Sequence, residues 1–191
     1  MTQRRSAVFG IVLTAVLFAV PLHALGWPRL HPRQLDVTLL GGKSFTSWHG
    51  QQQMTALEFE LPSAWLSKTD FVVGGGFHVI RQPRSWFGHQ YGDPDETARG
   101  VELFATARHV FGRTFAELGT GPMWSGDQTP AATSHFNMNS RLGVGVQLFP
   151  QSRHPMRVGY RFSHISNGGI ASRNPGMNLS SLVISMQLER R

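Results

Sequence analysis

Hydrophobic and polar residues alternate one by one along most of the chain, without the spacing of a helix. In the segment 156–163, for example, Val158 and Tyr160 alternate with Arg157 and Arg161. Successive side chains of a β-strand point to opposite faces of its sheet, so this pattern predicts strands with one apolar and one polar face. The alternation occurs in eight segments, at 34–39, 55–61, 71–79, 101–108, 115–121, 136–148, 156–163 and 181–189.

Eight strands joined by turn-rich segments predict a small barrel. Segments such as 82–97 and 126–134 are rich in Gly, Pro and Asp. We expect each strand to extend over about 9 to 11 residues, the length that crosses a bilayer when the strand is tilted. The polar faces carry Arg, Glu and Asn, which suits a narrow interior filled with side chains. The expected fold is all-β: an eight-stranded antiparallel outer-membrane β-barrel formed by residues 27–191 as a single domain.

Alternation alone does not show which face of the sheet is exposed to water. A soluble lipocalin-like barrel or a sandwich also alternates, but it turns its apolar face inward around a ligand. The last residues, Leu188-Glu189-Arg190-Arg191, differ from the aromatic residue with which outer-membrane barrels commonly end. A soluble periplasmic lipid carrier is therefore an alternative that the pattern does not exclude.

The beginning of the chain has the organisation of an export signal. A basic start precedes an apolar run that closes at Pro21, and residues 24–26 supply a small-x-small cleavage pattern. The run is shorter than the about 20 residues of a spanning helix. We therefore expect residues 1–26 to be a signal peptide, cleaved near Trp27, and the mature chain to reach the bacterial outer membrane.

Composition adds constraints on stability and partners. Cysteine is absent, so packing or a closed strand ladder must hold the exported chain together. The net charge of +7 comes almost wholly from arginine and suggests an anionic partner. Charge alone fits both nucleic acid and lipopolysaccharide phosphates. Export favours the phosphates of lipopolysaccharide, which arginine can bind in bidentate fashion, and no nucleic-acid partner is expected.

A polar cluster interrupts the apolar face of the penultimate strand. If Phe162 points toward lipid, His164 and Ser166 continue along the same face. On the last strand Asn178 shares the parity of Leu182, so an antiparallel hairpin can bring Asn178 beside His164. Polar groups placed against hydrocarbon are costly unless they bond to one another, which indicates a functional network.

Nucleophilic catalysis is the chemistry that such a cluster could perform. A serine hydroxyl attacks efficiently only when an imidazole removes its proton and a third group orients the ring. Ser166 would be the nucleophile, His164 the base and then the acid, and Asn178 the residue that orients His164. Asn167 and the Gly169 N–H could donate to the oxyanion. On spacing alone, a His two residues from a Ser more often marks ordinary solvated side chains.

Two short motifs resemble those of a known family. The segment 164–169 reads His-Ile-Ser-Asn-Gly-Gly, and 174–176 reads Asn-Pro-Gly before the last strand. Together they resemble the lipid A 3-O-deacylase (PagL) family, also described as acyloxyacyl hydrolases, over about residues 157–188. The resemblance implies an outer-membrane barrel that hydrolyses the ester at position 3 of lipid A and releases a 3-hydroxyacyl chain. It implies lipopolysaccharide as the substrate, and no metal or organic cofactor.

By motif position, the resemblance implies that His164 and Ser166 are the base and the nucleophile, with Asn167 and Gly169 as oxyanion donors. Asn178 departs from the family, whose well-studied members carry a glutamate there. An amide can accept the imidazole N–H, but it stabilises an imidazolium less well than a carboxylate. A slower enzyme, another substrate, and an inactive lipopolysaccharide-binding barrel all stay open. The oligomeric state stays open too, a homodimer included.

Overall fold

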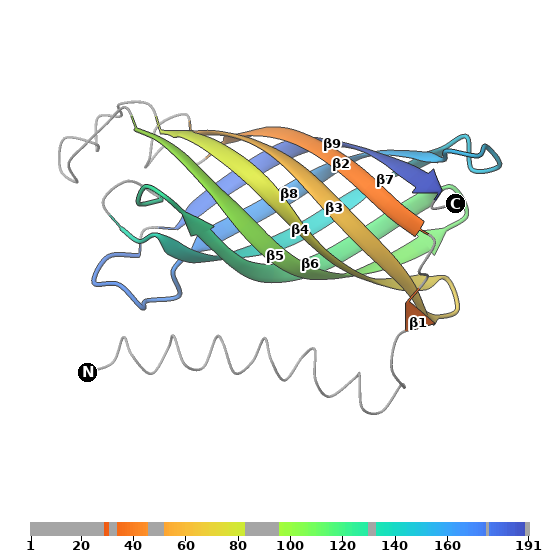
Figure 1. The fold of residues 1–191 in the computed structure, drawn as a ribbon, viewed down its shortest axis with the longest axis horizontal. Helices are drawn as coiled ribbons and strands as arrows, with labels where there is room; N and C mark the ends of the chain where they lie inside the picture. Colours follow the sequence, from red (N-terminus) through yellow and green to blue (C-terminus); the bar gives the residue numbers. More distant parts are fainter. Residues whose placement is uncertain are drawn as a thin grey trace.

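The computed structural model describes residues 29–30, 34–45, 52–82, 96–129, 133–174 and 176–189. The predicted signal peptide lies outside the described residues. Within them, no helix is long and apolar enough to cross a membrane. The strands of the described chain are β1 (Arg29–Leu30), β2 (Gln34–Ser44), β3 (Gln53–Leu66), β4 (Thr69–Gln82), β5 (Glu96–Phe111), β6 (Thr114–Ser125), β7 (Phe136–Leu148), β8 (Met156–Ser166) and β9 (Met177–Glu189) (Figure 1).

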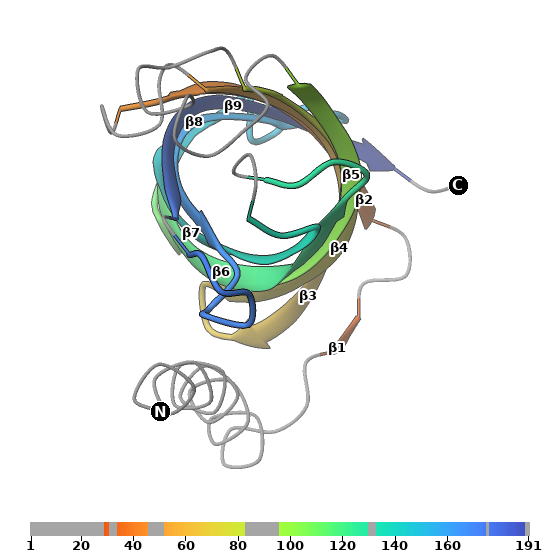
Figure 2. The ribbon, with the colours of Figure 1, turned by 90° about the vertical axis from the view of Figure 1, so that its left-hand side faces the viewer.

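Strands β2 to β9 form a closed antiparallel barrel. Each pairs with the next along the chain, and β9 pairs with β2, so the ring closes (Figure 2). The short β1 pairs with the end of β3. The prediction of eight barrel strands is confirmed. The barrel strands are 11 to 16 residues long, not the 9 to 11 expected, because they continue beyond the length that a bilayer crossing requires.

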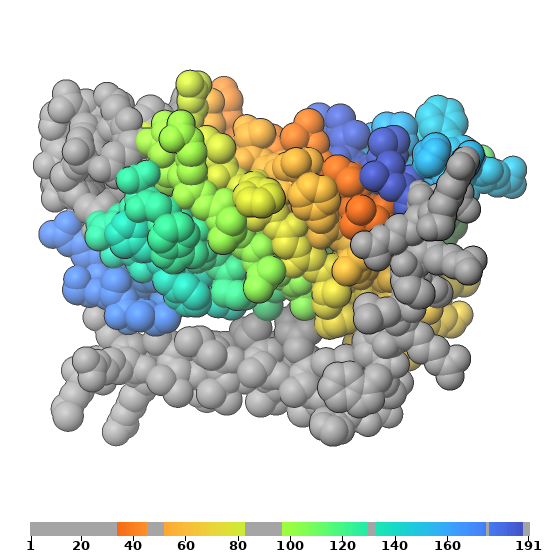
Figure 3. Space-filling view, in the orientation of Figure 1, coloured from red at the N-terminus to blue at the C-terminus, as the bar shows by residue number. Residues whose placement is uncertain are grey.

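The two faces of the sheet are sharply different. Acidic side chains such as Glu58 and Glu102 point inward and are buried, whereas Leu103 is 67% exposed and Phe77 62% exposed on the outer face. The outer surface in Figure 3 is formed by side chains of successive strands. An apolar outer face is the reverse of a lipocalin-like arrangement, so the soluble alternative is wrong.

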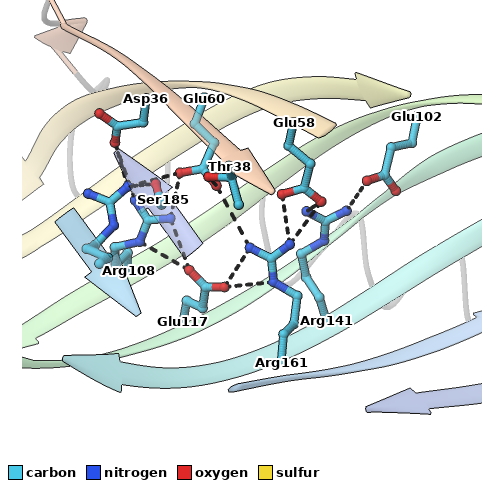
Figure 4. A network of polar contacts seen from close by, with 11 residues as sticks. Asp36, Thr38, Glu58, Glu60, Glu102, Arg108, Glu117, Arg141, Arg161 and Ser185 are labelled. Carbon is cyan, nitrogen blue, oxygen red and sulfur yellow. Dashed lines mark hydrogen bonds and ion pairs between the residues drawn. The ribbon is translucent and has the colours of Figure 1, made fainter. Parts of the chain in front are cut away.

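The barrel interior is crossed by buried ion pairs (Figure 4). Arg161 reaches Glu58 at 2.8 Å and Glu117 at 2.9 Å. Arg141 reaches Glu58 at 3.1 Å, and its second nitrogen reaches Glu102 at 2.8 Å. Each guanidinium therefore joins carboxylates on two other strands. Buried charges are tolerated when they are paired in this way, and the paired side chains fill the narrow lumen.

The long connections lie at one end of the barrel. At that end the connections have 8 to 13 residues, whereas those at the opposite end have two to seven. In outer-membrane barrels the longer loops are extracellular and the short turns periplasmic. Strand β8 ends, and β9 begins, at the end with the long loops (Figure 1). The predicted catalytic segment therefore lies at the outer-leaflet end of the barrel.

The strands are strongly tilted, which fixes the height of one residue relative to another. Following the register pairs around the barrel from Phe136 on β7 returns to β7 at Val146, ten residues further along. Barrel strands tilt by about 35–45° and lie about 4.8 Å apart. We call a line of Cα partners across successive strands a register row. One step along such a row, from β8 to β7 or from β7 to β6, therefore descends by about 3 Å toward the end of the barrel with the short turns.

Candidate active site

His164 and Ser166 lie on the outer face of β8, near its loop end. Between and beside them, Ser163, Ile165 and Asn167 are fully buried, so the strand alternates strictly at this point. His164 and Ser166 are half-buried and share the face of the exposed residues further along β8. The structure therefore places the predicted base and nucleophile on the side of the barrel that meets lipid.

Asn178 pairs directly with His164. The two residues are Cα partners across the β8–β9 ladder, and Asn178 Oδ1 lies 2.7 Å from His164 Nδ1. A carbonyl oxygen can only accept, so His164 donates from Nδ1 in this hydrogen bond. In the neutral imidazole, Nε2 then keeps a lone pair that can accept a proton. That is the tautomer a general base requires.

Ser166 is the last residue of β8 and lies two positions beyond His164 on the same face. Its Cα partner on β7 is Met138. The contacts among the described residues include no hydrogen bond between Ser166 and His164. Catalytic hydrogen bonds are often long without substrate and shorten only in the reacting complex.

Asn167 is the centre of the turn that follows β8. Its side chain is 2% exposed, donates from Nδ2 to the Arg173 carbonyl at 2.7 Å, and accepts the Gly169 N–H at Oδ1 at 2.9 Å. Its backbone N–H donates to Asn174 Oδ1 at 3.0 Å. Gly168 and Gly169 have φ of 63° and 83°, values that favour glycine. The motif residues therefore shape the turn.

The two predicted oxyanion donors are thus bonded to each other. The Gly169 N–H is used by Asn167 Oδ1, while the Asn167 amide keeps a second N–H beyond its bond to Arg173. The sequence pattern assigned no role to Asn174. Because its oxygen accepts the Asn167 N–H, its own NH₂ group remains a donor at the same turn.

Gly176 is a site residue that sequence reasoning missed. It has φ of 66°, and a Cβ at this position would lie 3.0 Å from His164 Cε1 and 3.6 Å from Nε2. The glycine backbone therefore packs against the reactive side of the imidazole. The Asn-Pro-Gly motif at 174–176 was the available signal, but sequence alone did not reveal the contact with His164.

Two aromatic rings lie near the polar trio. The rings of Phe45 and Phe162 lie 5.6 Å apart between centroids, and Phe45 is exposed.

Two acidic residues that could have replaced Asn178 in its role lie elsewhere: Glu117 points into the barrel, and Asp127 lies in the β6–β7 connection. Within the described part of the chain, no group of three or more His, Cys, Asp or Glu side chains could hold a metal ion.

Comparison with known proteins agrees with this arrangement. The sequence profile described as "Lipid A 3-O-deacylase (PagL)" matches residues 25–187, nearly the whole chain. The chain belongs to the PagL family. A curated relative, lipid A deacylase PagL from Bordetella bronchiseptica, is 37% identical over 54 residues. That alignment covers 28% of this chain and 28% of the relative.

Two solved structures show the same fold as this PagL family member. The crystal structure of the outer membrane enzyme PagL superposes with a TM-score of 0.54 at 17% identity, covering 78% of this chain and 97% of that one. The crystal structure of Neisserial surface protein A gives a TM-score of 0.52 at 13% identity, covering 82% and 94%. At these identities the likeness establishes the barrel and leaves the chemistry to the site residues.

Proposed function

We propose that this chain is an outer-membrane serine esterase that removes the ester-linked 3-hydroxyacyl chain at position 3 of lipid A. The observation that carries the proposal is the hydrogen bond between Asn178 Oδ1 and His164 Nδ1 on the outer face, which supports the base tautomer beside Ser166. Membership of the PagL family supports the substrate class. A lipid substrate would approach laterally from the outer leaflet.

The proposed reaction has two steps, formation and hydrolysis of an acyl-serine. Ser166 Oγ attacks the ester carbonyl carbon while His164 Nε2 takes the hydroxyl proton. The bond between the carbonyl carbon and the sugar oxygen then breaks, and His164 returns the proton to that oxygen. Water, deprotonated by His164, then attacks the acyl carbon. The bond between that carbon and Ser166 Oγ breaks, His164 returns the proton to Ser166 Oγ, and the 3-hydroxy acid is released. Asn178 keeps the ring oriented in both steps.

Donors at the β8–β9 turn would stabilise the oxyanion. The candidates are the second N–H of the Asn167 side chain and the NH₂ group of Asn174, because neither is used in the hydrogen bonds described above. Gly169 would contribute its N–H if substrate binding displaced Asn167 Oδ1 as its acceptor. Removing one such donor from an oxyanion site typically lowers kcat by about 10²- to 10³-fold.

Cationic side chains on the outer face suit the phosphates of lipid A. Lys43 and Arg81 are exposed on the outer face and lie in one register row, each paired with Gln53. Lys43 is also the Cα partner of Ser180, two residues beyond Asn178 on β9. Charges at the rim would hold the glycolipid head group while its acyl ester reaches Ser166.

The test is release of 3-hydroxy fatty acid from purified lipid A by the full chain in detergent micelles. Ser166→Ala should abolish release. Ser180→Ala is the matched control, because Ser180 has the same parity on β9 as Asn178 but does not pair with His164. Equal release by wild type and Ser166→Ala would contradict the proposed mechanism.

An inactive lipopolysaccharide-binding barrel is the second candidate. It is favoured by the amide at position 178, where an acidic residue would stabilise an imidazolium better. In that case the folded, membrane-inserted wild type would release no fatty acid at all, yet would still bind lipid A.

A further inference from the structure

The polar row at the site continues beyond the predicted catalytic residues. Ser140 on β7 is the Cα partner of His164, and Thr120 on β6 is the Cα partner of Ser140. The side chains of Ser140 and Thr120 both lie on the outer face. Their hydroxyl oxygens are 3.4 Å apart. Asn178, His164, Ser140 and Thr120 thus form one outward row across four neighbouring strands.

Along their own strands, Ser140 and Thr120 are flanked by apolar residues on the outer face. Leu142 follows Ser140 on the outer face and is 54% exposed, and Leu118 precedes Thr120 and is 61% exposed. Hydroxyls facing hydrocarbon are costly without hydrogen-bond partners. Two hydroxyls carry two O–H donors, and the bond between them uses one. The second donor can therefore bond a ligand that reaches the pair.

The row of Asn178, His164, Ser140 and Thr120 slopes relative to the membrane. Each step from β8 to β7 and from β7 to β6 descends by about 3 Å toward the short-turn end. Ser140 therefore lies slightly deeper in the bilayer than His164, and Thr120 deeper again. An acyl chain whose carbonyl is at Ser166 would extend in this direction, into the hydrocarbon layer. Its first polar group beyond the carbonyl would meet the hydroxyl pair.

We propose that the Ser140–Thr120 hydroxyl pair binds the 3-hydroxyl of the acyl chain being removed, and so sets the preference for 3-hydroxyacyl esters. This inference rests on the proposed esterase function. A 3-hydroxyacyl chain carries its hydroxyl on the second carbon beyond the carbonyl, close to the scissile bond. That hydroxyl both donates and accepts hydrogen bonds. It can accept the second O–H of the Ser140–Thr120 pair and donate its own O–H to a lone pair on one of the two hydroxyl oxygens.

The test compares two synthetic substrates that differ only in this hydroxyl. A glucosamine 1-phosphate bearing a 3-O-(3-hydroxytetradecanoyl) group is compared with one bearing 3-O-tetradecanoyl, each hydrolysed by the full chain in detergent micelles. The quantity measured is the ratio of kcat/KM for the hydroxylated and the plain ester. Wild type should favour the hydroxylated ester. Ser140→Ala combined with Thr120→Val should lower that ratio about five- to tenfold.

Controls separate specificity from damage to the barrel. The double variant should hydrolyse the plain ester at the wild-type rate, and Ser140→Thr, which keeps the hydroxyl, should retain the wild-type ratio. Ser180→Ala should leave the ratio unchanged. An unchanged ratio in the double variant would overturn the inference while leaving the esterase intact. Equal losses on both esters would overturn it as well. If wild type cleaves neither ester nor lipid A, the proposed function fails and the inference with it.

Discussion

Replacing Asn178 by aspartate should accelerate ester hydrolysis, and replacing it by alanine should slow it. Asn178 Oδ1 lies 2.7 Å from His164 Nδ1, and the two residues are Cα partners on adjacent strands. Aspartate has the same shape as asparagine, so it keeps an oxygen at this place and adds a negative charge. Alanine leaves the imidazole N–H without its partner.

The magnitudes follow from how the charge on the imidazole changes. During attack the ring becomes an imidazolium, and hydrogen bonds to charged groups contribute about 1.5–3 kcal/mol, against about 0.5–1.5 kcal/mol for neutral pairs. Losing the partner altogether should raise the barrier by about 2 kcal/mol, which is roughly 30-fold in kcat. Gaining a carboxylate should lower the barrier by about 1 kcal/mol, which is roughly fivefold.

The assay is kcat and KM for release of 3-hydroxy fatty acid from lipid A in detergent micelles. Because Asn178 acts through His164 and makes no contact with substrate in this scheme, the effects should appear in kcat rather than KM. The expected order of kcat is aspartate, then wild type, then alanine. Equal kcat for Asn178→Ala and wild type would refute the positioning role, and so would a change confined to KM.

Two further substitutions test the site turn and the barrel interior. Gly176→Ala should lower kcat about 10- to 100-fold in a folded barrel, because its Cβ would displace the His164 ring from 3.0 Å away. Arg161→Met should lower the free energy of unfolding, measured by urea titration in detergent, by about 1–3 kcal/mol, because Glu58 and Glu117 would lose their shared cation and keep only Arg141 and Arg108 as partners.

Each of these variants has a matched control in the same chain. Gly112 has a φ of 64°, close to that of Gly176, but a Cβ there would meet no atom within 4 Å. Gly112→Ala should therefore share the backbone strain and keep full activity. Arg113 is exposed in the β5–β6 turn, so Arg113→Met should change stability by no more than about 0.5 kcal/mol. Equal activity of the two glycine variants would contradict the proposed contact with His164.

The alternation of residues was enough to predict the strands and the faces of the site. Because side chains alternate with a period of two, the parity of Phe162 on β8 also determines that of His164 and Ser166. Burial of Ile165 between them confirms this parity. The alternation could not show whether the polar or the apolar face lines the barrel interior. The buried carboxylates show that the polar face does.

Contacts that depend on register or on the path of a turn could not be read from the sequence. Ser140 lies opposite His164 only because the β7–β8 hairpin has its particular register, which the chain between the two strands determines. The Asn167 side chain bonds a carbonyl six residues later, which requires the whole turn to be folded. Arg161 and Glu58 are 103 residues apart and meet only after closure of the barrel.

The most direct test of the central proposal is mass spectrometry of lipid A from Gram-negative cells that express this chain. Cells expressing Ser166→Ala at equal abundance in the outer membrane provide the comparison. We expect loss of one ester-linked 3-hydroxyacyl group from lipid A with the intact serine, and no loss with the alanine variant. Identical lipid A in the two strains, with both proteins folded and inserted, would contradict the proposed deacylase.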